Sequence, residues 1–147
     1  MINIRLVGDR EVIFDLNRIN REAPGAMRQI VGRSALQVKR EAMLNLSGRM
    51  LKVRSDELRL NLPIIRGGGR DNPWAIITSN TFYAPVHEFG MTIRARNFPY
   101  MTFKTDRGWR RAKQVIIPPR PFMKAAFQAS IPAIEKIAEE EIQRLIR

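Results

Sequence analysis

Apolar side chains recur at helical spacing in the first third of the chain. From about Arg18 to Leu46 the recurring positions are Met27, Ile30, Val31, Ala35, Val38, Ala42 and Leu46. A 3.6-residue repeat of this length predicts one long amphipathic helix. Pro24 is tolerated only within a first helical turn, so the helix is predicted to start at Asn20, with Asn17 or Asn20 as its cap.

A different pattern precedes this helix. Ile2, Ile4 and Leu6 alternate with polar residues, and the apolar run of residues 12–14 follows Gly8-Asp9-Arg10. Short apolar segments on both sides of a turn signal predict a β-hairpin over residues 3–14. The stretch carries charge early and lacks an unbroken apolar run, so it is unlike a signal peptide.

Short alternating segments fill the middle of the chain. The alternation of Leu58, Leu60 and Leu62 with polar residues predicts a strand that ends near residues 63–65. The flexible turn Gly67 to Asn72 leads into a returning strand over residues 74–78. The further predicted strands cover residues 92–94, 100–103 and, after a turn at 106–108, 109–117. Short strands with short links imply an antiparallel sheet. The glycine run does not match a phosphate-binding loop, because no Lys-Ser or Lys-Thr follows it.

Two proline-containing segments mark corners between the predicted elements. They are Tyr83-Ala84-Pro85-Val86-His87-Glu88-Phe89-Gly90 and Pro118-Pro119-Arg120-Pro121-Phe122-Met123. Pro85 pushes Ala84 toward an extended conformation, which predicts that a strand ends at Tyr83-Ala84. Residues 86–89 then form one helical turn, and Gly90 lets the chain reverse.

The second segment ends a strand and starts a helix. Its prolines cannot donate ladder hydrogen bonds, so the preceding strand stops at Ile117. Pro121 suits a first helical position, and Phe122 is predicted to be buried against the sheet. The apolar positions of the following amphipathic helix are Phe122, Ala126, Ala129, Ile134, Ile137, Ala138, Ile142, Leu145 and Ile146. Pro132 is expected to kink or restart this helix, with Ser130 as a new cap.

Length and composition allow one domain. A chain of 147 residues buries enough surface for a self-sufficient core. We therefore predict a single α+β domain over residues 1–147, in which an antiparallel β-sheet packs against a long N-terminal helix (about residues 20–46) and a C-terminal helix (residues 121–147). The chain has no cysteine, which excludes disulfides and thiolate metal sites and suits a reducing compartment. No run approaches the roughly 18 apolar residues of a membrane span, so no membrane contact is expected.

The net charge of +12 is densest in a predicted basic loop or hairpin at about residues 94–113, where seven basic side chains face one acid, Asp106. Such a surface attracts polyanions or acidic partners in a salt-dependent way. A solvated face that only maintains solubility is the alternative interpretation. Trp109 follows a turn and precedes two arginines, so we expect it to be partly exposed. The candidate interface or DNA-facing residues are Arg94, Arg96, Lys104, Arg107, Trp109, Arg110, Arg111 and Lys113.

No recognisable catalytic constellation is present. His87 is the only histidine, and the side chain of its neighbour Glu88 diverges from it on a strand and lies about 100° away on a helix. A zinc site needs three or four ligands, which one histidine without cysteines does not supply. Glu139-Glu140-Glu141 is interpreted as a solvated helix face, with a carboxylate-only magnesium site left open. We therefore predict no enzymatic activity, no cofactor and a structural role for His87.

The two corners, together with Ser47-Gly48-Arg49-Met50 and the following Leu58-Arg59, resemble the head-tail joining or tail-completion (neck) family of long-tailed bacteriophages. In that family a Tyr-Ala-x-x-x-Glu-Phe-Gly turn follows a central strand, and a Pro-x-Arg-Pro-Phe turn starts the last helix. The resemblance covers the chain from about Arg18 onward. The matching structural-motif residues are Tyr83, Pro85, His87, Glu88, Phe89, Gly90, Pro119, Arg120, Pro121 and Phe122.

The resemblance also implies roles at the first corner. Tyr83 and Phe89 are expected to pack there, and Glu88 to hold an arginine or a backbone amide. Two features depart from the family pattern. Met91-Thr92 stands where many relatives have another glycine, and residues 3–14 lie outside the match. These departures leave the subfamily open.

By resemblance, the chain is expected to be a structural virion protein that forms a homo-oligomeric ring at the head-tail junction or tail end, as a neck, tail-completion or tail-terminator protein. Its expected partners are other neck, connector and tail-tube proteins and genomic DNA in the lumen, with assembly in the host cytoplasm. Two further classes stay open. One is a basic nucleic-acid-binding protein whose aromatics stack on bases, and the other is a small ribonuclease toxin that uses His87 or the arginines.

Overall fold

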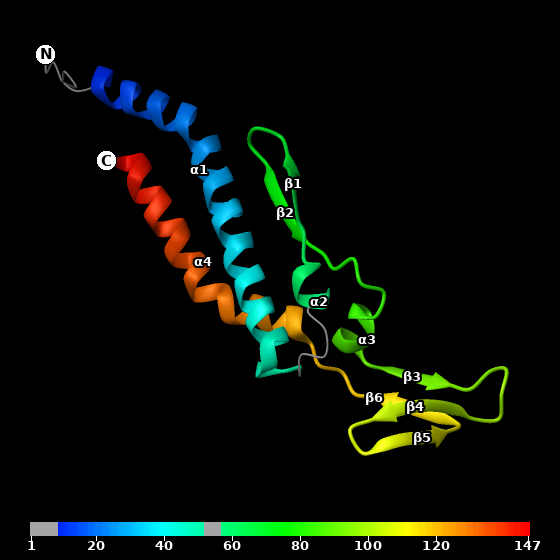
Figure 1. Cartoon of the computed structure of the whole chain (residues 1–147). Coiled ribbons are helices and arrows are strands. Elements are labelled where there is room, and N and C mark those ends of the chain that lie inside the picture. Colours follow the sequence, from blue (N-terminus) through cyan, green and yellow to red (C-terminus); the bar gives the residue numbers. More distant parts are fainter. Residues whose placement is uncertain (1–8, 52–56) are drawn as a thin grey trace, which may run out of the picture. The chain divides into compact units, whose positions relative to one another are not determined.

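The computed structural model describes residues 9–51 and 57–147 and has an α+β fold (Figure 1). Its helices are α1 (Asp9–Leu44), the π-helical turn η1 (Asn45–Arg49), α2 (Glu57–Leu60), α3 (Ala84–Phe89) and α4 (Phe122–Ile146). Its strands are β1 (Ile64–Gly68), β2 (Pro73–Ile77), β3 (Met91–Arg94), β4 (Met101–Thr105), β5 (Gly108–Ala112) and β6 (Gln114–Ile117). The predicted α+β class is confirmed. The strands pair antiparallel in three two-stranded sheets, β1 with β2, β3 with β6 and β4 with β5.

Helix α1 begins at Asp9 and not at Asn20. The predicted hairpin is therefore wrong for residues 9–14, and residues 1–8 lie outside the described part. Val12, Leu16 and Ile19 also fit the i, i+4, i+7 spacing of a helix, and a short apolar run does not distinguish the two periods. Pro24 lies inside the helix, where the lost backbone hydrogen bond and the clash of its ring with the preceding turn together cost about 3 kcal/mol. The many further helical residues offset this local cost.

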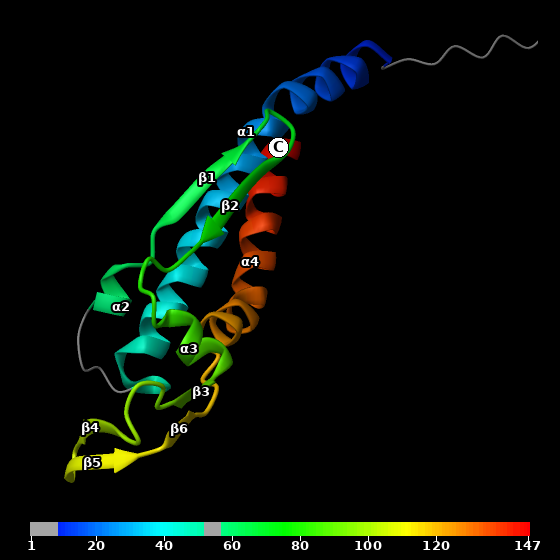
Figure 2. The same cartoon turned by 90° about the vertical axis from the view of Figure 1, so that its right-hand side faces the viewer.

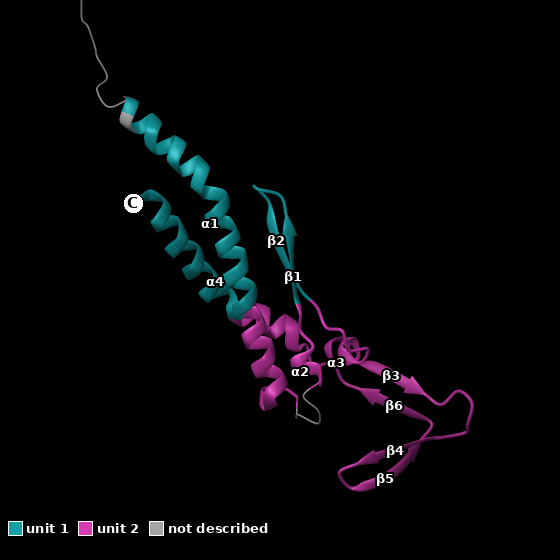
Figure 3. Cartoon of the chain, turned by 45° about the horizontal axis from the view of Figure 1, so that its top comes forward, with its two compact units in different colours: residues 1–37, 64–77, 130–147 teal, residues 38–63, 78–129 magenta. Residues whose placement is uncertain are grey.

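The chain forms two compact units, drawn in different colours in Figure 3. The described residues of the first unit are 9–37, 64–77 and 130–147, and those of the second are 38–51, 57–63 and 78–129. Both long helices contribute residues to each unit. The prediction of a single domain stays a prediction, and the two units are described separately below.

In the first unit, the β1–β2 hairpin and α4 lie on different sides of α1, and the hairpin runs along that helix (Figures 1 and 2). Arg33 of α1 donates hydrogen bonds to Glu141 Oε1 and Glu140 Oε2 of α4, each at 2.7 Å. Glu141 is buried, and Arg144 also donates to it, at 3.0 Å. The prediction that residues 139–141 form a solvated face is therefore wrong for Glu141, because a tertiary arginine partner compensates the burial of its charge.

The hydrophobic core of the second unit gathers residues from both long helices and from the middle of the chain. Its buried apolar side chains are Val38, Ala42, Leu46, Leu51, Leu58, Leu62, Ala84, Phe122 and Ala126. Asn45 is also buried, and its side-chain amide donates to the backbone oxygen of Phe122 at 3.0 Å. Phe122 is 1% exposed, so its predicted burial is confirmed, whereas its packing against the sheet stays a prediction.

Residues 57–60 form helix α2, so the strand predicted from Leu58, Leu60 and Leu62 is wrong. Leu58 and Leu62, four residues apart, are buried, whereas Leu60 is 70% exposed. Burial therefore follows the helical i, i+4 spacing and not the two-residue alternation of a strand. The following strand, β1, includes Gly67 and Gly68 of the predicted turn.

Several predicted boundaries in the second half of the chain change. Tyr83 belongs to a turn and Ala84 starts α3, so no strand ends there. The strand predicted over residues 109–117 is two strands, separated by Lys113. Helix α4 continues through Pro132, and Ser130 lies inside it, so the predicted restart is wrong.

Candidate interaction site: the corner and the basic arm

The two corner segments meet in the folded chain. The Arg120 amide donates to the His87 carbonyl oxygen at 2.7 Å. Gly90 has a φ of +74°, and a Cβ added there would come within 2.9 Å of the Ile117 carbonyl oxygen. A residue with a side chain is therefore disfavoured at Gly90 both by its conformation and by the close approach of the neighbouring strand. The segments that carry the sequence resemblance thus form one joint, from which β3 departs and to which β6 returns.

Glu88 holds the start of α4. Its Oε2 accepts the Met123 amide at 2.9 Å, and its Oε1 accepts the Lys124 amide at 3.0 Å. The first amides of a helix have no partner within the helix, and a negative charge is favourable at that end. The expectation that Glu88 holds a backbone amide is confirmed.

His87 and Tyr83 pack edge to face, with ring centroids 6.1 Å apart. Tyr83 also donates to Glu57 Oε2 at 3.2 Å. His87 Nδ1 is buried and lacks a hydrogen-bond partner among the described residues. Burial, followed by the positive charge of Arg120, lowers the His87 pKa below its ordinary 6.5. Phe89 is 78% exposed, so the expectation that it packs at the corner is wrong.

Residues 91–117, here called the basic arm, extend from this joint as the β3–β6 and β4–β5 pairs (Figure 1). No residue between Ala84 and Phe122 is buried. A two-stranded hairpin is only marginally stable without a hydrophobic face packed on something else. The arm therefore has an ordered backbone pairing but no core of its own.

All eight candidate interface residues predicted from the sequence lie on the arm, and all are exposed. The expected exposure of Trp109 is confirmed, at 70%. In the β4–β5 register Lys104 is opposite Trp109, and Thr102 is opposite Arg111. Because directly opposed residues share a face of an antiparallel pair, one face presents an indole between two cationic side chains. Arg110, opposite Phe103, lies on the other face.

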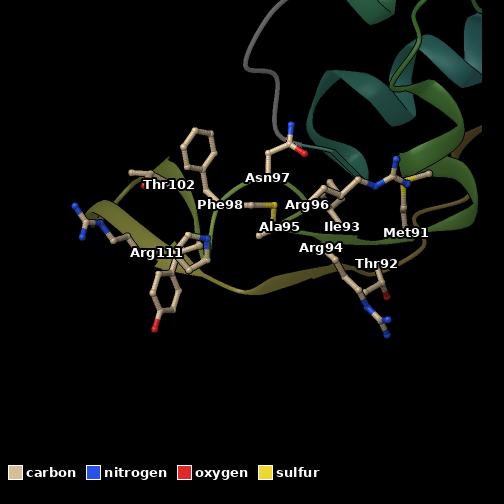
Figure 4. Close-up of a pocket in the computed structure, with 13 residues that line it drawn as sticks. Met91, Thr92, Ile93, Arg94, Ala95, Arg96, Asn97, Phe98, Thr102 and Arg111 are labelled. Atoms are coloured by element: carbon tan, nitrogen blue, oxygen red, sulfur yellow. The ribbon is translucent and has the colours of Figure 1, made fainter.

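A groove of about 900 Å³ follows the arm (Figure 4). It is lined by residues 91–102 and by Arg111, and this lining contains three arginines and no carboxylate. Phe98 is 76% exposed, and Tyr100 is half exposed, with the Lys113 ammonium 5.9 Å from the centre of its ring. Sequence reasoning did not identify the groove, because residues 95–99 carry no helical or strand period. The surface suits an anionic partner with apolar or planar groups.

The described residues contain no group of three or more His, Cys, Asp or Glu side chains placed to hold a metal ion. Within residues 9–51 and 57–147, no helix has both the length and the apolar character needed to span a bilayer. A comparison of the chain with protein-family models, curated proteins and solved structures finds no match.

Proposed function

We propose that this chain is a structural protein of a tailed-phage virion, which forms a ring at the head-tail junction or the tail end. The observation that carries the proposal is the basic arm, a paired but coreless segment whose cationic and aromatic side chains are exposed. Such a surface becomes stable when a partner covers it. The joint that holds the arm is built from the same two segments that resemble the neck family.

The exposed surface of the chain supports an assembling role. Phe82, Phe89 and Phe98, all in the second unit, are each more than three-quarters exposed. In this proposal these side chains lie on surfaces that neighbouring proteins cover.

In this proposal, copies of the chain contact one another and neighbouring neck, connector or tail-tube proteins. The basic arm meets an acidic face of a neighbour or DNA in the lumen. The protein resides in the virion and assembles in the host cytoplasm. No cofactor takes part.

The test reverses the charge of the arm. An Arg110→Glu, Arg111→Glu variant should fold with the parent's circular dichroism and melting temperature, because both side chains are exposed. It should fail to enter particles in a complementation assay. The control, Arg40→Glu with Arg147→Glu, makes the same change in net charge at exposed positions outside the arm. Normal particle incorporation and infectivity of the arm variant would contradict the proposal.

A second candidate function, nucleic-acid binding, is favoured by the indole of Trp109 between Lys104 and Arg111. Aromatic rings flanked by cations bind single strands by stacking and charge neutralisation. Binding of an oligonucleotide whose affinity falls steeply with salt, and is lost in Trp109→Ala, would support this function.

A further inference from the structure

A second groove, of about 530 Å³, lies in the first unit between α1 and the β1–β2 hairpin. Its lining includes Arg28 and Leu36 from α1 and Arg66 and Trp74 from the hairpin. In the β1–β2 register Trp74 is opposite Gly67, and a Cβ added at Gly67 would overlap the indole. Trp74 is 43% and Leu36 54% exposed, so the groove offers apolar surface that the described residues of this unit leave uncovered.

The groove is also positively charged. Arg33 in its lining is neutralised by Glu140 and Glu141. Arg28 and Arg66 are exposed and have no ion pair or hydrogen bond with any described residue. The Arg66 guanidinium lies near α1, where a Cβ added at Gly32 would stand 3.9 Å from its central carbon. Two unpaired guanidinium groups beside an indole form a site for carboxylates on an apolar support.

A matching surface lies on α4 of the same unit. Its exposed residues Ile131, Glu135, Glu139, Ile142 and Ile146 follow one another at steps of three or four and therefore form one stripe along the helix. The two glutamates stand one turn apart in the middle of this stripe, with isoleucines on both sides. Neither glutamate has an ion pair or hydrogen bond among the described residues. The stripe is on another face of α4 than the buried Glu141, which faces Arg33.

We infer that the groove between α1 and the β1–β2 hairpin receives the acidic α4 stripe of a second copy of this chain. The argument is one of complementarity: two unpaired arginines and exposed apolar groups on one surface match two unpaired glutamates and exposed apolar groups on the other. The hairpin and α4 lie on different sides of α1 (Figure 1). When the groove of each copy receives the stripe of the next copy, the contact is head-to-tail, and repetition of such a contact generates a ring when its rotation closes. This inference rests on the proposed function and names the contact between its copies.

The experiment exchanges the charges of the two surfaces and measures oligomer size by sedimentation and mass photometry of the full chain. Arg28→Glu with Arg66→Glu should raise the concentration needed for assembly by about tenfold or more, because like charges then face each other across the contact. Glu135→Arg with Glu139→Arg should do the same. The quadruple variant restores opposite charges and should assemble as the parent does, as should an equimolar mixture of the two double variants. Arg40→Glu with Arg147→Glu is the control for the change in net charge of the groove variant.

Any of the following four results would overturn the inference. A parent that stays monomeric at every attainable concentration excludes a second copy as the occupant. Double variants that assemble like the parent exclude this contact but leave the ring itself intact, so the proposed function survives that result. Loss of assembly in the groove variant alone would identify another acidic occupant. Loss in both double variants without rescue in the quadruple variant would show that the effect is not one of paired charges.

Discussion

At the scale of single residues, Phe122 links the proline corner to the core. It is the first residue of α4 and is 1% exposed, and its backbone oxygen accepts the buried Asn45 amide. Truncation to alanine should cost about 3–5 kcal/mol of stability, because it removes a large apolar side chain and leaves a cavity. Denaturant unfolding of Phe122→Ala measures this cost. Phe127→Ala is the control in the same helix, since Phe127 is 56% exposed, and its midpoint should change little. A Phe122→Ala variant that melts within a degree or two of the parent would contradict the placement.

His87 makes the stability of the fold depend on pH. Its pKa is lowered from 6.5 in the folded chain, first by burial and then by the charge of Arg120. As pH falls below about 6.5, the unfolded chain binds a proton that the folded chain does not, so stability decreases. The contribution is fully present above that pH and is lost as pH falls toward the lowered folded pKa.

This dependence can be assigned to one side chain, because the chain has one histidine. Denaturation midpoints measured between about pH 7 and about pH 5.5 should fall for the parent and stay nearly level for His87→Gln, since histidine is the side chain that ordinarily titrates there. An equal slope in both proteins would show that His87 is not the group responsible.

At the scale of elements, we expect the basic arm to be the least stable part of the second unit. No arm residue is buried, and each arm strand pairs with one other strand among the described residues. Local opening is easiest where few apolar contacts form. Amides of β3 to β6 should therefore exchange at least about tenfold faster than those of Ala42 and Ala126 in the monomeric protein. Their exchange should slow in an assembled particle. Arm amides as protected in the monomer as those of the two long helices would contradict a coreless arm.

The joint between the two corner segments fixes where the basic arm starts and ends. Glu88 binds the first amides of α4, and the Arg120 amide binds the His87 carbonyl oxygen. These contacts join segments more than thirty residues apart in the chain. The flanks of the arm are consequently anchored on the core although the arm itself contributes nothing buried.

At the scale of the whole molecule, we expect no enzymatic activity. General acid-base catalysis needs a titrating group within hydrogen-bond reach of a partner, and metal-assisted hydrolysis needs converging ligands. The His87 imidazole packs on Tyr83, and the Glu88 carboxylate is occupied by two backbone amides. Nuclease and ribonuclease turnover with magnesium, manganese or zinc should stay at background in the parent, in His87→Ala and in Glu88→Gln. Metal-dependent turnover that is lost in either variant would favour the ribonuclease alternative.

Much of the architecture follows from short-range sequence patterns. The helical spacing around residues 27–46 and 122–146 predicts the two long helices, and the prolines after Ile117 end β6. The run of basic residues around Trp109 predicts an exposed segment, which the arm confirms. These features depend on side chains a few positions apart, so the sequence by itself determines them.

Tertiary structure alone decided which competing local patterns prevail and which distant groups meet. Leu58 and Leu62 satisfy both a strand and a helical period, and burial in the core selects the helix. Glu141 belongs to an acidic run that in sequence is typical of a solvated face, but in the folded chain it is hydrogen-bonded to Arg33 of α1. The hydrogen bond between the two corners, from the Arg120 amide to the His87 carbonyl oxygen, likewise joins residues that are distant in the sequence. Such long-range contacts form only when the chain segments between the two residues fold and bring them together. They therefore depend on the packing of the whole chain and are not predictable from a short stretch of sequence.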